Sequence, residues 1–318
     1  MVALKSWVRR RPVLAFYVLA FALTWLGWWP MAAHNRGLIQ LDVPGLFFLG
    51  GLGPGVAAWV VMRVLLGTAA TDTLLRPLLR WRVGVRWFVV AAALFPAILL
   101  LAVVLRGSLE EELAALGTVP VLALALVRYL LAAVPEEVGW RGFALPALQA
   151  RHSALTSSLV VGVLWALWHL PLLLGGDPTM STYPLVLYTV WVVAEAVLYT
   201  WVFNSARGSL LVVVVLHGVA NVTGAFGSAP WAVTAITLTA ALTVVAVLGP
   251  EHLCRTGRRV MLSPGADAPA SSASGSPPGS AGGASRRSAG GASRRSAGGA
   301  SRRSAGGASR GPARGSSR

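Results

Sequence analysis

The sequence predicts an all-α membrane protein: a polytopic bundle of about eight spanning helices, followed by a disordered C-terminal tail. Of its 318 residues, 55% are hydrophobic and only 12% are charged, and the mean hydropathy is +0.67. Soluble domains carry about 25% charged residues. The apolar residues divide into separate runs, most of them near the ~20 residues that a helix needs to cross a ~30 Å hydrocarbon core. These observations together predict an integral membrane protein.

The apolar runs follow one another along residues 1–261, with short polar loops between them. The first run is preceded by basic residues, but it continues through Trp25, Trp28 and Trp29 without a small-residue cleavage site, so it reads as a retained helix and not as a signal peptide. The expected spans are approximately residues 13–33, 43–66, 86–106, 119–147, 156–175, 183–204, 209–227 and 231–250.

Basic residues alternate between the two sides of these spans. One set of loops and termini holds Lys5, Arg9, Arg10, Arg11, Arg76, Arg80, Arg82, Arg86, Arg151, Arg207, Arg255, Arg258 and Arg259. The alternate loops hold only Arg36 and Arg106. Because short cytoplasmic loops are enriched in Lys and Arg, this pattern predicts a multi-pass protein of the cell membrane with both termini in the cytoplasm.

The segment 262–318 differs in composition from the membrane domain at 1–261. It repeats Ser-Ala-Gly-Gly-Ala-Ser-Arg-Arg with a period of eight from Ser280 onward, and it contributes half of the net charge of +16. With no apolar face to bury, it is expected to be disordered. Its arginines could hold anionic lipid headgroups or nucleic acid by charge alone. A solvated extension without a chemical role is the simpler interpretation, and no specific nucleic-acid partner is predicted.

Three charged residues occur close together inside the fourth apolar run. They are Glu136, Glu137 and Arg141. A charged side chain at membrane depth costs at least ~2.5 kcal/mol, so this cluster calls for a functional explanation. Glu137 and Arg141 are four residues apart and can form an ion pair along one helix face. Glu136 lies about 100° away around the helix and remains free for chemistry.

Two further polar pairs lie in apolar runs. Trp165 and His169 are four residues apart in the fifth run, and His217 and Asn221 are four apart in the seventh, so each pair shares a helix face. At 1.5 Å rise per residue, both histidines and Glu136 reach a similar level near mid-membrane. The three helices can therefore bring these side chains to one cavity.

One carboxylate, two imidazoles and an amide suit a hydrolytic site. Glu136 can act as general base toward water. His169 and His217 can hold that water directly, or bind a metal that acidifies it. Asn221 can donate hydrogen bonds to an oxyanion. The Glu137–Arg141 pair would hold the helix in place and tune the properties of Glu136.

These motifs resemble those of the type II CAAX prenyl proteases and their bacterial relatives, the CPBP (Abi) intramembrane endopeptidases. The family pattern is Glu-Glu-x-x-x-Arg, then Phe-x-x-x-His, then His-x-x-x-Asn/Asp, on an eight-helix core. Residues 119–225 contain all three in that order. The one departure is Trp165, where the family usually has Phe.

The resemblance implies an endopeptidase that cleaves peptides of membrane-bound or lipid-attached proteins, prenylated C-termini among them, at a site open toward the cytoplasm. It implies Glu136, His169, His217 and Asn221 as the catalytic set. It leaves the metal open, because the family has been described both as zinc enzymes and as glutamate proteases without a metal. With zinc, the ligands would be His169, His217 and Glu136, a set that catalytic zinc accepts.

Several other residues bear on the function, and two other function classes fit buried charges of this kind. The single cysteine, Cys254, excludes an intramolecular disulfide and a cysteine-based metal site. Arg128 and Glu195 also lie within apolar runs and are expected to be structural or to line a cavity. A proton-coupled transporter also buries such charges, but the duplicated half typical of transporters is not evident. A membrane scaffold that retains the motifs is the third alternative.

Overall fold

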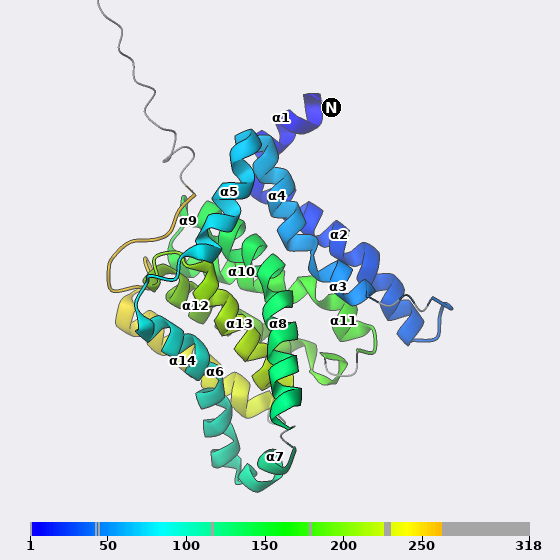
Figure 1. Ribbon diagram of the computed structural model, residues 1–318, viewed down its shortest axis with the longest axis vertical. Coiled ribbons are helices and arrows are strands. Elements are labelled where there is room, and N and C mark those ends of the chain that lie inside the picture. Colours follow the sequence, from blue (N-terminus) through cyan, green and yellow to red (C-terminus); the bar gives the residue numbers. More distant parts are fainter. Residues whose placement is uncertain are drawn as a thin grey trace, which may run out of the picture. The chain divides into compact units, whose positions relative to one another are not determined.

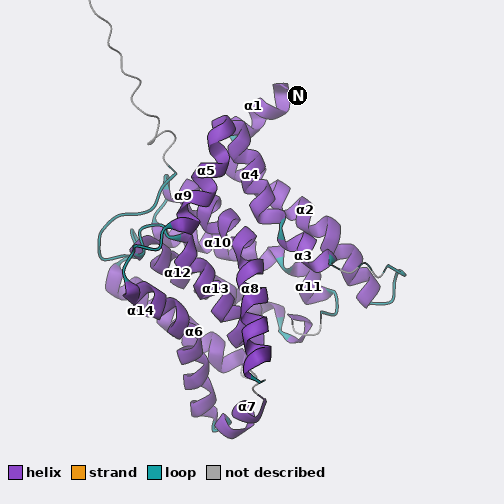
Figure 2. Cartoon of the chain, in the orientation of Figure 1, coloured by secondary structure: helices purple, strands orange, loops and turns teal. Residues whose placement is uncertain are grey.

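The computed structural model describes residues 2–41, 43, 45–115, 118–177, 180–225 and 230–262. Throughout these residues the regular elements are helices (Figure 2). The expected disorder of the tail falls on residues that, apart from Leu262, lie outside this range. In chain order the elements are α1 (Val2–Arg10), α2 (Pro12–Asn35), α3 (Leu46–Gly51), α4 (Gly53–Leu66), η1 (Gly67–Ala69), α5 (Ala70–Leu75), η2 (Arg76–Leu79), α6 (Val85–Arg106), α7 (Leu109–Ala115), α8 (Val119–Gly139), η3 (Trp140–Ala144), α9 (Leu145–Gln149), α10 (Ala154–Trp168), α11 (Leu170–Leu174), η4 (Met180–Thr182), α12 (Leu185–Ser205), α13 (Leu210–Ala225) and α14 (Pro230–Leu248).

The predicted fold class, an α-helical membrane bundle, is confirmed. Within the part of the chain that the structure describes, seven helical stretches are long and apolar enough to cross a membrane: Pro12–Asn35, Leu46–Leu79, Val85–Arg106, Val119–Gln149, Ala154–Leu174, Leu185–Ser205 and Pro230–Leu248. The eighth expected span is the shorter α13, of 16 residues, which packs against α6, α8 and α12 (Figure 1). Because its neighbours bury most of it, α13 needs less apolar length than a helix surrounded by lipid.

Three of the expected continuous spans are interrupted. The second span divides into α3 and α4 after Gly51. The fifth breaks at His169, which ends α10 before the short α11 with Pro171 at its start. The fourth runs from α8 through a single π-helical turn, η3, into α9. Such π turns frequently occur at functional sites, and this one directly follows the Glu136–Glu137 pair.

Helices α4 and α8 approach each other closely through glycine. A Cβ added to Gly139 would lie 2.5 Å from the Cβ of Pro54 and 2.7 Å from its carbonyl carbon. Gly55 on α4 lies in turn against Pro135 on α8, where an added Cβ would meet the proline Cα at 3.0 Å. These two contacts place the Glu136–Glu137 turn against α4.

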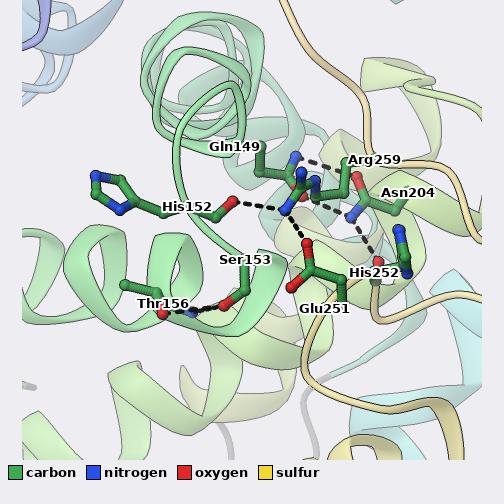
Figure 3. Close-up of polar contacts among 8 residues, drawn as sticks. All are labelled: Gln149, His152, Ser153, Thr156, Asn204, Glu251, His252 and Arg259. Carbon is green, nitrogen blue, oxygen red and sulfur yellow. Dashed lines mark hydrogen bonds and ion pairs between the residues drawn. The ribbon is translucent and has the colours of Figure 1, made fainter.

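The loops rich in basic residues are joined to one another by hydrogen bonds at one end of the bundle, which we call the arginine-rich face. Gln149 and Asn204 exchange amide hydrogen bonds of 3.2 and 2.8 Å, and Asn204 also donates to the carbonyl of His252 at 3.0 Å (Figure 3). Arg259 donates to the carbonyl of His152 at 2.9 Å. In the neighbouring loops, Arg80 donates to the carbonyl of Arg207 at 3.2 Å. This face is therefore closed by side-chain and backbone contacts.

The close approach of α4 and α8 predicts that Gly139→Ala destabilises the protein. Alanine normally favours a helix over glycine, but here its methyl group must displace the backbone of Pro54, and overpacking of this kind costs about 1–3 kcal/mol. Thermal unfolding in detergent should show a lower midpoint for Gly139→Ala. Gly51→Ala, where an added Cβ meets nothing within 4 Å, is the matched control. Equal midpoints for the two variants would contradict the packing argument.

Candidate active site

A cavity of about 910 Å³ lies in the membrane domain, between α2, α3, α8, α10, α12 and α13. Its walls include Glu136, His169, His217 and Asn221, the four residues that the sequence predicts as a catalytic set. They come from three helices and are separated by up to 85 positions in the chain. Their location in one cavity is what a common site requires, and their catalytic roles remain a prediction.

Glu136 lies at the inner end of the cavity, one turn before the end of α8, and is 9% exposed. Its Oε2 accepts a hydrogen bond of 3.0 Å from the indole Nε1 of Trp165 on α10. A charge-assisted bond of this type is stronger than one between neutral groups and fixes the direction of the carboxylate. The residue at the aromatic position of the second motif thus contacts the expected general base directly.

His169 ends α10, and its ring is held by the helix itself. Its Nδ1 lies 2.9 Å from the backbone carbonyl of Trp165. Because a carbonyl oxygen can only accept, Nδ1 carries the hydrogen, and in the neutral ring Nε2 then has a free lone pair. A histidine bonded in this way could be purely structural, but the bond leaves the second nitrogen available at the cavity.

His217 on α13 is held in the same way by a carboxylate. Its Nδ1 lies 2.7 Å from Oε1 of Glu137, and the same oxygen accepts a bond of 2.9 Å from Arg141. Glu137 and Arg141 are fully buried. The expected ion pair between them is present, and it also holds an imidazole. With a carboxylate on Nδ1, neutral His217 likewise has its lone pair on Nε2.

The guanidinium of Arg141 lies between two aromatic rings. Its central carbon is 4.5 Å from the ring centre of Trp165 and 4.4 Å from that of Tyr199. Both rings also contact the imidazole of His217, at centroid distances of 5.4 and 5.7 Å. Cation–π contacts away from water are worth about 2 kcal/mol, so these rings partly offset the cost of burying the charge.

Several residues outside the predicted catalytic set also line the cavity. Glu195 on α12 is one of them and is 5% exposed. Arg128 on α8 lies over the ring of Phe48 at 5.2 Å. Glu195 and Arg128 were expected to be structural or to line a cavity, and both lie in the cavity wall. The signal for Glu195 was a lone carboxylate in an apolar helix, but only the packing of α12 reveals which side it faces.

Zinc at Glu136, His169 and His217 stays a prediction. Across the described ranges, no three His, Cys, Asp or Glu side chains come together as a group that could hold a metal. The partners of both histidines are on Nδ1, so Nε2 of each ring is left for a water or for a metal that these residues would hold.

Comparison with known proteins identifies the region that carries this site. Residues 118–223 match the family of type II CAAX prenyl endopeptidases described as Rce1-like. We call residues 118–223 the Rce1-like region. The chain is also 25% identical to a CAAX prenyl protease 2 of Methanococcus maripaludis over 229 residues, which are 65% of this chain and 81% of the relative. The resemblance inferred from the three motifs is confirmed.

All seven motif residues fall inside the Rce1-like region, which extends from the start of α8 to near the end of α13. The family supports a membrane-embedded protease over the transporter and scaffold alternatives. Within this Rce1-like region, the structure adds the contact between Trp165 and Glu136, which a phenylalanine could not make.

Trp165→Phe should reduce turnover while leaving the fold intact. Phenylalanine keeps an aromatic face toward Arg141 but removes the N–H that Glu136 accepts. Loss of a hydrogen bond to a charged group is worth about 1.5–3 kcal/mol, or roughly a 10- to 150-fold fall in kcat. The measurement is kcat and KM for a cleaved peptide. Trp87→Phe, on α6 and outside the cavity wall, is the control; a kcat for Trp165→Phe within twofold of wild type would contradict the proposed role.

Glu137→Gln should lower stability far more than the same change in an exposed ion pair. It leaves the buried Arg141 without a counter-charge, which costs about 3–5 kcal/mol. Glu251 pairs with Arg259 at the surface, where its side chain is 57% exposed, and such pairs contribute about 0–1 kcal/mol. Thermal unfolding of Glu137→Gln and Glu251→Gln in detergent compares the two. Similar small losses for both would show that the buried pair is not a structural requirement.

Proposed function

We propose that the protein is an intramembrane endopeptidase that hydrolyses peptide bonds of membrane-associated proteins or peptides through a water activated by Glu136. The observation that carries the proposal is the convergence of Glu136, His169, His217 and Asn221 on one cavity, within a region of the Rce1-like family. A hydrolase needs a general base, groups that hold the water and a hydrogen-bond donor for the oxyanion. Glu136, the two histidines and Asn221 can fill these three roles in turn.

In the proposed reaction, Glu136 takes one proton from the water, while Nε2 of a histidine accepts a hydrogen bond from the hydrogen that stays on the water oxygen. The water oxygen then attacks the carbonyl carbon of the scissile peptide bond. The negative charge that develops on the carbonyl oxygen is stabilised by the amide of Asn221. Glu136 returns the proton to the leaving nitrogen as the carbon–nitrogen bond breaks, which restores the carboxylate.

The positions of the reacting groups depend on three neighbouring residues: Trp165, Glu137 and Arg141. Trp165 orients the carboxylate of Glu136, and Glu137 orients the ring of His217. Arg141 neutralises the charge of Glu137. These three residues act through the proposed catalytic groups and are positioning residues for the reaction.

The outer wall of the cavity suits a lipid-attached or membrane-bound substrate. Phe48, Leu124 and Leu131 line it and are 47%, 71% and 69% exposed. Such side chains on α3 and α8 offer an apolar surface beside the peptide site. A prenylated C-terminal peptide of the CAAX type is the substrate that the name of the Methanococcus relative suggests, and an acyl or helical anchor would meet the same surface.

Cleavage by the purified protein in liposomes tests the proposed function. Wild type is expected to cleave one or more members of a panel of farnesylated and unmodified peptides. Glu136→Ala and His217→Ala should lower kcat by at least about 100-fold, because each removes a group used in water activation. Glu110→Ala and His152→Ala, on exposed residues away from the cavity, are matched controls. Cleavage that survives both site substitutions would refute the assignment, and proton-coupled uptake without cleavage would favour the transporter.

Chelation tests the zinc alternative separately. The proposed water activation uses the carboxylate of Glu136 without a metal, so peptide cleavage should persist after treatment with a strong zinc chelator. Complete loss of cleavage on chelation, restored by added zinc, would instead establish a metal-dependent reaction. The measurement is the initial rate before and after chelation, with Glu136→Ala as the zero-activity reference.

A further inference from the structure

One face of α12 forms a wall of the cavity. Tyr188, Val192 and Glu195 follow one another at helical spacing, which brings them to the same side of α12, and all three line the cavity. The Oε1 atom of Glu195 is buried without a hydrogen-bond partner, and the residues that the structure describes offer Glu195 no ion pair. A carboxyl group buried in this way is unfavourable unless something pairs with it, so its place in the wall calls for a function.

Glu195 lies along α12 at a level between the two histidines of the proposed reaction. Tyr188, two turns before it, contacts the ring of His169 at a centroid distance of 5.8 Å. Tyr199, one turn after it, contacts the ring of His217 at 5.7 Å. At 1.5 Å rise per residue, Glu195 is ~10 Å along the helix axis from Tyr188 and ~6 Å from Tyr199. A group held by Glu195 would therefore lie close to the scissile bond.

Three aromatic rings belong to the same wall. Tyr183 stacks on Trp191 at 5.9 Å with an interplanar angle of 10°, and Tyr188 meets these two rings edge-on at 6.2 and 5.9 Å. All three line the cavity, and Trp191 is one helical turn before Glu195. Because the faces of aromatic rings carry partial negative charge, rings beside a carboxyl group favour a cation over an anion.

The two arginines of α8 and the π turn have partners of their own. Arg128, on the α8 wall of the cavity, lies over the ring of Phe48 at 5.2 Å. Arg141 pairs with Glu137 at 2.9 Å. Within the described ranges, neither arginine forms an ion pair with Glu195. The counter-charge that Glu195 lacks would be supplied by a cationic ligand in the cavity.

We propose that the α12 wall is a substrate subsite for a positively charged side chain, a lysine or arginine next to the scissile bond, with Glu195 as its counter-charge and Tyr188 and Trp191 as its aromatic neighbours. The proposal rests on the proposed function, because it concerns which peptides that reaction accepts. It makes Glu195 a specificity residue that touches the substrate side chain and takes no part in water activation. An acidic residue at the same substrate position would bring two carboxyl groups together and is disfavoured.

Peptides that differ at one position test the subsite. In a peptide that wild type cleaves, each residue flanking the scissile bond is changed in turn to Lys, to Glu and to Met, which has a long side chain without charge. At one position wild type should prefer Lys over Met by at least about tenfold in kcat/KM, with Glu cleaved least, and Glu195→Gln should reduce this preference to within about twofold. Arg128→Gln, which removes a charge from another wall of the cavity, is the matched control and should keep the preference.

Two results of this experiment would overturn the subsite. One is a wild-type enzyme that cleaves the Lys and Met peptides equally well at both positions. The other is a preference for Lys that survives Glu195→Gln, including in a variant that has lost activity toward all peptides to the same extent, since a merely structural role would have that effect.

A binding measurement tests the subsite without any need for cleavage. Butylammonium has the chain and charge of a lysine side chain, and 1-butanol is its neutral counterpart. A ligand that binds the folded protein raises the midpoint of thermal unfolding. In detergent at equal ionic strength, saturating butylammonium should raise the wild-type midpoint by about 2 °C or more relative to butanol, and Glu195→Gln should abolish the difference. No difference in wild type, or an equal one in Glu195→Gln, would overturn the proposal. If no peptide is cleaved, the proposed function fails, while the butylammonium result still decides the subsite.

Discussion

The buried ion pair between Glu137 and Arg141 is the constraint on which the site depends. A charge in this position is tolerated only with a partner, and here one carboxylate serves both Arg141 on the π turn and His217 on α13. The guanidinium in turn lies between Trp165 of α10 and Tyr199 of α12. Four segments that are far apart in the chain are therefore positioned by one network of charge and aromatic contacts.

The network also determines what each histidine can do. A carbonyl on Nδ1 of His169 and a carboxylate on Nδ1 of His217 place the ring hydrogens on those nitrogens. Neutral imidazoles held in this way can accept a hydrogen bond or bind an electrophile through Nε2. Trp165 connects this arrangement to Glu136, because its ring face contacts Arg141 while its edge donates to the carboxylate.

The sequence was sufficient to predict the helical membrane fold, the motif residues and the Glu137–Arg141 pair, since each follows from apolar length or from spacing along one helix. It was not sufficient for features that arise between helices. Trp165 stands where the family usually has Phe, and its indole N–H reaches a carboxylate 29 positions away. Likewise, the position of Glu195 in the cavity wall depends on how α12 packs, which no local pattern encodes.

The exposed apolar wall at Phe48, Leu124 and Leu131 has a kinetic consequence for an enzyme of this kind. A substrate anchored in the same leaflet approaches by diffusion in two dimensions, and its anchor raises the local concentration of the peptide far above that in bulk water. The quantity that governs the rate is then the mole fraction of substrate in the bilayer. Diluting the membrane with inert lipid would slow the reaction even where the total amounts of protein and substrate stayed the same.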